Sequence, residues 1–194
     1  MLRLGITGGI GSGKSTVCRI FEFLDVPVYY ADQRSKELVS TQPEIRKAIV
    51  HYFGEEAFKD GIYNRPYMAG IVFKDKSKLE LLNGIIHPFV LKDWDEFCSK
   101  YAHLPYIIKE AAIMLETESR NSIDKVALVY APKELRIQRV LERDHTEKAA
   151  VEARMNMQMP EEEKLKKADL VIYNDGEHSL IEQVLKLHSQ LSAS

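Results

Sequence analysis

Several features are scarce in this sequence, and each scarcity excludes a class of protein. The 194 residues include two cysteines, Cys18 and Cys98, too few for a disulfide framework and not spaced as a metal pair. No uninterrupted apolar run approaches the roughly 20 residues that span a bilayer, and the N-terminus lacks the features of a signal peptide. The net charge of −2 argues against a surface devoted to nucleic acid. These absences predict a cytoplasmic protein that binds neither membranes nor nucleic acid, with both cysteines acting as small core hydrophobes.

Residues 8–15 read GGIGSGKS and match the phosphate-loop pattern G-x-x-x-x-G-K-[ST] at every fixed position. Glycines in such a loop let backbone N–H groups point at a phosphate, at the N-terminus of the helix that follows. Lys14 is expected to reach the β- and γ-phosphates, and Ser15 to bind Mg²⁺. A dinucleotide fingerprint is disfavoured because Lys14 stands where glycine would be needed. The loop therefore predicts a site for a nucleoside triphosphate.

Short β-branched segments alternate with helix-prone sequence, which predicts an α/β fold with a central parallel sheet. Between residues 44 and 103 the strand signals vanish and apolar residues recur at spacings of three and four, as expected of a helical insert. We therefore expect a core of residues 1–43 and 104–194, with a lid within about 139–168. The predicted strands are residues 3–7, 26–30, 105–110, 125–130 and 168–173.

Asp32 follows the second predicted strand, which we expect beside the strand that enters the phosphate loop. There its carboxylate can accept the proton of an acceptor hydroxyl during phosphoryl transfer. An alternative role is an N-cap for a helix over residues 33–39. Asp-x-x-Gly and Asn-Lys-x-Asp, the motifs of a GTPase switch, are absent from the sequence. This favours a small kinase.

Arg136, Arg139 and Arg143 are spaced to share one face of a helix. In a lid they can bring positive charge to the transferring phosphoryl group when the site closes. Most of the other charges in this region, which ends in Glu161-Glu162-Glu163-Lys164, are expected to form a solvated helix face. The six histidines lack the spacing of metal ligands, so no metal centre other than Mg²⁺ is expected.

The chain resembles the dephospho-CoA kinase family almost from end to end. The phosphate loop alone is shared by many families, but its combination with a distal His-Pro and an Arg-x-x-x-Arg-Asp is much narrower. The matching segments are residues 5–16 (GITGGIGSGKST), 31–32 (AD), 82–88 (LNGIIHP), 138–144 (QRVLERD), Gln158 and 168–176 (ADLVIYNDG).

This resemblance implies a nucleoside/nucleotide-kinase-like three-layer fold with a helical CoA domain and a lid. It further implies ATP-dependent phosphorylation of the ribose 3′-hydroxyl of dephospho-CoA, with Mg²⁺ as cofactor, in the cytoplasm and without an obligate protein partner. Carried over by position, the catalytic residues are Asp32, Lys14, Arg139 and Arg143, and the ATP-binding residues are Gly11, Ser12, Gly13, Lys14, Ser15, Thr16 and Asn174. Thr7 and His87 are the expected substrate contacts.

Two positions depart from the family pattern. Tyr30 replaces the first acid of the common Asp-Ala-Asp, and Ala112 replaces the proline of Glu-Ala-Pro-Leu-Leu-Phe-Glu. Asp32, the second acid, is retained and is expected to keep the catalytic role. His87 also has a structural interpretation, in a helix-start turn before Pro88, and Asn174 can be read as a turn residue.

Other functions are compatible with parts of the pattern. A nucleoside or nucleotide kinase of the same fold also carries a helical acceptor domain, and a slow nucleotide-dependent switch would share the phosphate loop. Aromatic residues of the insert can meet an extended pantetheine-bearing substrate or can belong to the core. They are Tyr63, Tyr67, Phe73, Phe89, Trp94 and Phe97.

Overall fold

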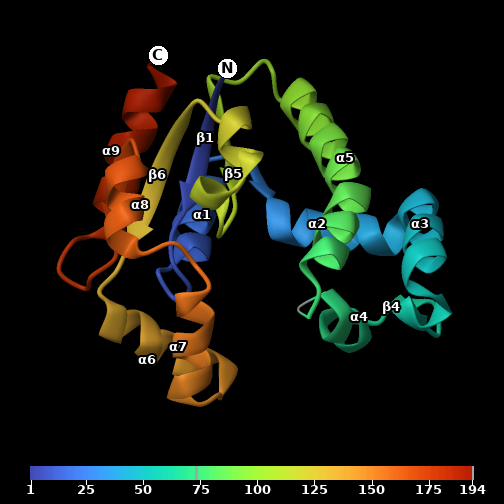
Figure 1. Ribbon diagram of the computed structural model, residues 1–194. Coiled ribbons are helices and arrows are strands. Elements are labelled where there is room, and N and C mark those ends of the chain that lie inside the picture. The colour runs from blue at the N-terminus through green and yellow to red at the C-terminus, as the bar shows by residue number, and fades with distance from the viewer. Residues whose placement is uncertain (73, 194) are drawn as a thin grey trace. The chain divides into compact units, whose positions relative to one another are not determined.

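The computed structural model describes residues 1–72 and 74–193, which form two compact units (Figure 1). The first unit comprises Met1–Tyr30 and Lys100–Ser194, and the second comprises Ala31–Ser99. The second unit therefore contains most of the predicted insert, together with residues 31–43.

The first unit is built on a five-stranded parallel sheet with the order β2-β5-β1-β6-β7. Each strand lies where a β-branched segment predicts one, although β2 and β7 begin two residues later than expected. The strands are β1 (Leu2–Thr7), β2 (Val28–Tyr30), β5 (Tyr106–Glu110), β6 (Lys125–Tyr130) and β7 (Leu170–Tyr173).

The expected neighbour relation between the first two strands is wrong. β5 lies between β1 and β2, because Glu110 is in register with Ile6 on one side and with Tyr30 on the other. The second unit follows β2 in the chain, and β5 comes after it and lies between β1 and β2 in the sheet. Parallel neighbours need a long crossover, so adjacency in sequence does not fix adjacency in the sheet.

Helices α1 (Lys14–Glu22) and α9 (Leu180–Ser192) cover one face of this sheet and contact each other. Val17 and Phe21 of α1 are fully buried there, as their helical spacing predicts. The opposite face meets α8 (Glu161–Lys167) and the short helix η2 (Met114–Glu116). The three-layer fold is thereby confirmed.

Two further helices of the first unit pack on each other. They are α6 (Lys133–Asp144) and α7 (Lys148–Asn156), whose buried residues Ile137, Val140 and Val151 form a separate apolar cluster. His145 ends α6 in the left-handed conformation, with φ of 48°.

The second unit is helical, as predicted, but it also contains a small hairpin that the sequence reasoning missed. Asp60 and Gly61 connect the two short strands and both have positive φ, at 51° and 79°. Asp-Gly is a common sequence for such a turn, so a signal was present. The elements are α2 (Ala31–Thr41), α3 (Pro43–Phe53), η1 (Glu55–Ala57), β3 (Phe58–Lys59), β4 (Ile62–Tyr63), α4 (Arg65–Val72) and α5 (Lys76–Lys100).

α5 is continuous through Pro88, so His87 lies in a helix interior and the predicted helix-start turn is wrong. Among the insert aromatics, Trp94 is buried and Tyr67 donates its hydroxyl to the Phe53 carbonyl at 3.0 Å, as core residues do. Phe73 lies outside the described residues. Across the described ranges, no helix is both long and apolar enough to cross a membrane.

Candidate active site

The phosphate loop connects the end of β1 to the start of α1. Gly13 is the N-cap of α1 in the left-handed conformation, with φ of 94° and ψ of 24°. Its carbonyl accepts hydrogen bonds from Thr16 N and Val17 N at 3.0 and 3.1 Å. A left-handed cap is unfavourable for residues with a Cβ, which explains glycine at this position.

Lys14, the first residue of α1, folds back over the loop. Its Nζ donates to the Gly8 carbonyl at 2.9 Å and to the Gly9 carbonyl at 3.4 Å. Ser15 and Thr16 are exposed in the first turn of the same helix. The lysine ammonium and two hydroxyls thus lie at the positive end of the helix dipole, where phosphate groups bind favourably.

Asn174, the residue after β7, holds the loop from the side. Its Nδ2 donates to the Ser12 carbonyl at 2.8 Å. Arg139 in turn donates to the Asn174 carbonyl at 3.1 Å and to its Oδ1 at 3.3 Å. A Cβ on Gly13 would collide with Asn174 Nδ2. Asn174 is therefore more than a turn residue, because it joins the loop to α6.

Behind the loop, Arg136 and Glu161 form a buried ion pair that the sequence reasoning missed. Arg136 NH1 lies 2.8 Å from Glu161 Oε2, and their side chains are 10% and 8% exposed. A Cβ on Gly9 would collide with both side chains, so the pair packs directly against the loop. Lys164, 3.6 Å from Glu161, is also buried.

The expected solvated face is therefore wrong for Glu161 and Lys164. Their spacing of three residues directs both side chains inward, where opposite charges compensate the cost of burial. The burial of Glu161 and Lys164 depends on Arg136, which is distant from them in the sequence. The shared-face interpretation of the arginines gave no sign of this contact.

Gln158 makes a second contact with the loop. Its Oε1 accepts a hydrogen bond from Ile10 N at 3.0 Å. Gln158 stood among the residues of the family resemblance, but its chemistry cannot be read from the sequence. The structure shows that it fixes one peptide of the phosphate loop.

Arg143 lies at the far end of α6 and has other partners. It donates to Asp144 through Nε at 2.6 Å and NH2 at 3.1 Å, and Arg154 of α7 donates to the same carboxylate at 2.8 Å. Hydrogen bonds from Arg143 and then Arg154 hold the pKa of Asp144 well below its usual range. The three arginines of α6 thus serve three different contacts: Glu161, Asn174 and Asp144.

Thr7, Cys18 and Tyr30 lie close to the loop in the sequence or the fold. Thr7 is 1% exposed and its hydroxyl donates to the Ala112 carbonyl at 3.3 Å. Burial raises the pKa of the Cys18 thiol strongly, as expected of a core hydrophobe. Burial also raises the pKa of Tyr30, so this phenol stays protonated and does not replace the carboxylate common in the family.

Asp32 and His87 belong to the second unit and are both exposed. Asp32 is the second residue of α2, inside its first turn. The predicted cap for a helix starting at residue 33 is therefore wrong, because the helix already begins at Ala31. A carboxylate in a first helical turn is favoured by the helix dipole, and exposure leaves it accessible to an acceptor hydroxyl.

The parallel sheet and the loop at the end of β1 define a P-loop protein of the kinase-like class. Comparisons with known proteins narrow this class. The family profile described as CoaE, dephospho-CoA kinase, matches residues 2–179. A dephospho-CoA kinase from Bacteroides fragilis is 41% identical over 186 residues, which cover 96% of this chain and 91% of that protein.

Two solved structures extend the comparison. A crystal structure of a Thermus thermophilus protein has a TM-score of 0.87 and 33% identity, covering 97% of this chain and 96% of that one. Dephospho-CoA kinase from Campylobacter jejuni has a TM-score of 0.72 and 26% identity, covering 98% and 97%. The chain belongs to the dephospho-CoA kinase family.

Proposed function

We propose that the protein phosphorylates the ribose 3′-hydroxyl of dephospho-CoA with ATP, giving coenzyme A and ADP in the last step of coenzyme A biosynthesis. The observation that carries this proposal is the family match over residues 2–179, combined with a complete phosphate loop in a parallel sheet. ATP and dephospho-CoA are its small-molecule substrates. We place the reaction in the cytoplasm and infer no obligate protein partner.

We propose that the phosphates of ATP bind at Gly11, Ser12, Gly13, Lys14, Ser15 and Thr16, through N–H groups of the loop, the Lys14 ammonium and the exposed hydroxyls at the start of α1. The hydrogen bonds of Lys14 to two loop carbonyls support this role, because they hold its ammonium over the loop. The contact of Asn174 with Ser12 supports a place for Asn174 beside the nucleotide.

Mg²⁺ fits the residues at the start of α1. Ser15 supplies an exposed hydroxyl there, and Mg²⁺ usually takes one or two protein ligands together with phosphate oxygens and water. Among the described residues, no cluster of three or more His, Cys, Asp and Glu side chains could form a separate metal cage. When bound, the ion would neutralise charge on the phosphates.

Catalysis is proposed for four side chains. Asp32 accepts or orients the acceptor proton, and Lys14 neutralises charge on the transferring group. Arg139 and Arg143 supply further positive charge from the lid region. The hydrogen bonds of Arg139 to Asn174 support a position beside the nucleotide. Arg143 is paired with Asp144, so it must break this ion pair before it can bind a phosphate.

A substrate contact is proposed for His87, and a role in the substrate site without direct contact for Thr7. His87 is exposed on α5 and can reach a ligand directly. Thr7 is buried, so we assign it a positioning role through its hydrogen bond to Ala112.

The test is release of ADP by the purified protein with ATP and Mg²⁺ in the presence of different acceptors. Dephospho-CoA is compared with adenosine, AMP, CMP and no acceptor. A strong increase with dephospho-CoA supports the proposal. An increase with a nucleoside or nucleotide alone would identify a related kinase, and a rate that no acceptor raises would favour a switch.

A further inference from the structure

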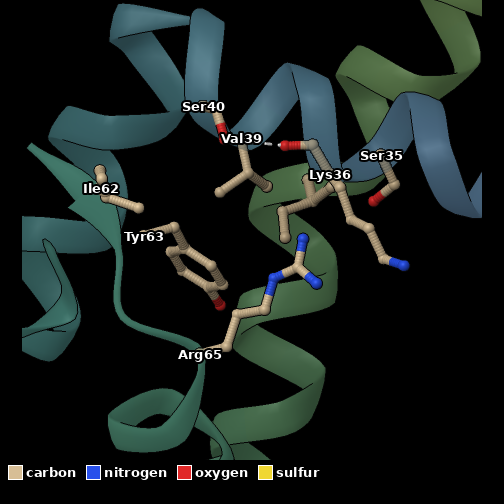
Figure 2. A pocket seen from close by; sticks show the side chains of 8 residues that line it. Ser35, Lys36, Val39, Ser40, Ile62, Tyr63 and Arg65 are labelled. Carbon is tan, nitrogen blue, oxygen red and sulfur yellow. Dashed lines mark hydrogen bonds between the residues drawn. The ribbon is translucent and has the colours of Figure 1, made fainter. Parts of the chain in front are cut away.

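The second unit contains a pocket of about 320 Å³ that is lined by two cationic side chains and by no acidic one (Figure 2). Its volume is in the range of small-molecule sites. The lining residues come from α2, β4, the start of α4 and α5. They are Ser35, Lys36, Val39, Ser40, Ile62, Tyr63, Arg65 and Ile86.

The two cations of this pocket have no carboxylate to neutralise them within residues 1–72 and 74–193. Neither the Arg65 guanidinium nor the Lys36 ammonium makes a hydrogen bond or ion pair there. Arg34, on the same helix as Lys36, is by contrast bound to Asp93 through Nε at 2.9 Å and to Glu37 at 2.6 Å. Cations without an ion-pair partner, in a pocket lined by no acidic side chain, favour an anionic ligand.

A second pocket of the same unit shows that this charge pattern is local. It has a similar volume of about 330 Å³ and lies along the other side of α2, between α2, α3 and α5. Glu44, Asp93 and Glu96 line it, with Lys92 as its cation. Acidic side chains outnumber the cation in this lining, so the two cavities are similar in size but differ in the charge of their lining.

Apolar groups complete the lining of the cationic pocket. Ile62 of β4 is 73% exposed, which is unusual for an isoleucine. Val39 of α2 and Ile86 of α5 also line the pocket. In Figure 2 the guanidinium of Arg65 points toward α2, and the Tyr63 ring lies between Ile62 and Arg65. The pocket therefore suits an anion that is joined to an apolar chain or ring.

We propose that this pocket binds the diphosphate of dephospho-CoA. The Arg65 guanidinium forms a fork with phosphate oxygens, and Lys36 adds a point charge. Ile62 and Tyr63 contact the adjoining pantetheine chain. The inference rests on the proposed function, because it takes dephospho-CoA as the acceptor.

Steady-state kinetics of Arg65→Ala and Lys36→Ala test this assignment. In each variant, the KM for dephospho-CoA is expected to rise about tenfold or more, because a charged hydrogen-bond partner is lost. The KM for ATP and kcat are expected to stay within about twofold, since the interaction is made equally before and during transfer. Arg65→Lys keeps the charge but loses the fork, so its KM should lie between those of the wild type and Arg65→Ala.

Lys47→Ala is the matched control, because Lys47 is an exposed lysine of the same unit that does not line the pocket. It should keep the wild-type KM. An active wild type whose Arg65→Ala and Lys36→Ala variants also keep that KM overturns this inference alone. If these two variants show a lower kcat or a higher KM for ATP, with an unchanged KM for dephospho-CoA, the inference is likewise overturned. A wild type inactive on dephospho-CoA overturns the proposed function first.

Discussion

Asp32 is an exposed carboxylate in the first turn of α2, and its proposed role makes a direct prediction. Asp32→Asn should lower kcat by about 10²-fold or more, because an amide cannot accept a proton. The KM for ATP should change little, as expected for an interaction made in the transition state. Steady-state kinetics at saturating dephospho-CoA measure both values.

Glu44→Gln provides the comparison for Asp32→Asn. Glu44 is an exposed carboxylate in the first turn of α3, in the same unit, and has no proposed catalytic role. Its amide variant should keep the wild-type kcat. Near-normal turnover of Asp32→Asn would remove Asp32 from the catalytic residues.

Asn174 is the second residue whose substitution is informative. Asn174→Ala removes the hydrogen bond to the Ser12 carbonyl and one acceptor of Arg139, so the free energy of unfolding should fall by about 1–3 kcal/mol. Urea unfolding followed by circular dichroism measures this change. The KM for ATP should rise in the same variant, because the loop loses a support. Asn156→Ala, on an exposed asparagine at the end of α7, should leave both unchanged.

The start of α1 allows a prediction for an element of structure. Gly13→Ala places a Cβ in the left-handed region and against Asn174, so ATP affinity should fall at least about tenfold. Gly84→Ala, in the open interior of α5, should instead raise the free energy of unfolding by up to about 1 kcal/mol. Titration calorimetry with ATP and urea unfolding measure the two effects. Unaltered ATP affinity in Gly13→Ala would contradict the proposed loop geometry.

Individual elements could be predicted where local chemistry decides them. The strands of the first unit, the phosphate loop and α1 all follow from short apolar runs, glycines and helical spacing. The continuity of α5 through Pro88 did not follow, because proline usually ends or kinks a helix. The Asp60-Gly61 hairpin was missed although its turn signal was present.

Contacts between distant segments could not be predicted. The position of β5 between β1 and β2, the Arg136–Glu161 pair and the Gln158 contact with Ile10 join residues far apart in the chain. Composition and spacing describe one segment at a time, and therefore identify Arg136 as a cation without its partner. The resemblance to the family supplied Asn174 and Gln158 as residues of interest, and the structure supplied their contacts.

At the scale of the whole molecule, paired carboxylates predict how stability depends on pH. The pKa of several aspartates is lowered mainly by hydrogen bonds that their carboxylates accept. One of them runs from His178 N to Asp175 Oδ1 at 3.1 Å. The pKa of Asp175 falls from 3.8 to about 2. Among the described residues, the aspartates with a lowered pKa are Asp75, Asp124, Asp144 and Asp175.

A folded-state pKa below the unfolded value means that the unfolded chain binds more protons at low pH. The stabilising contribution of Asp175 is therefore complete above its unfolded pKa near 3.8, and is lost as the pH falls toward 2. In urea unfolding, wild type and Asp175→Asn should differ at pH 6 and converge near pH 2. A difference that does not change with pH would contradict the assignment.

We conclude that this chain transfers a phosphoryl group from ATP to dephospho-CoA. The most direct test is to identify the product of a complete reaction by mass spectrometry and nuclear magnetic resonance. The expected product is heavier than dephospho-CoA by one phosphoryl group, which is attached at the ribose 3′-oxygen, and it forms in equal amount with ADP. Recovery of unchanged dephospho-CoA while ATP is consumed, or a phosphoryl group at another position, would contradict it.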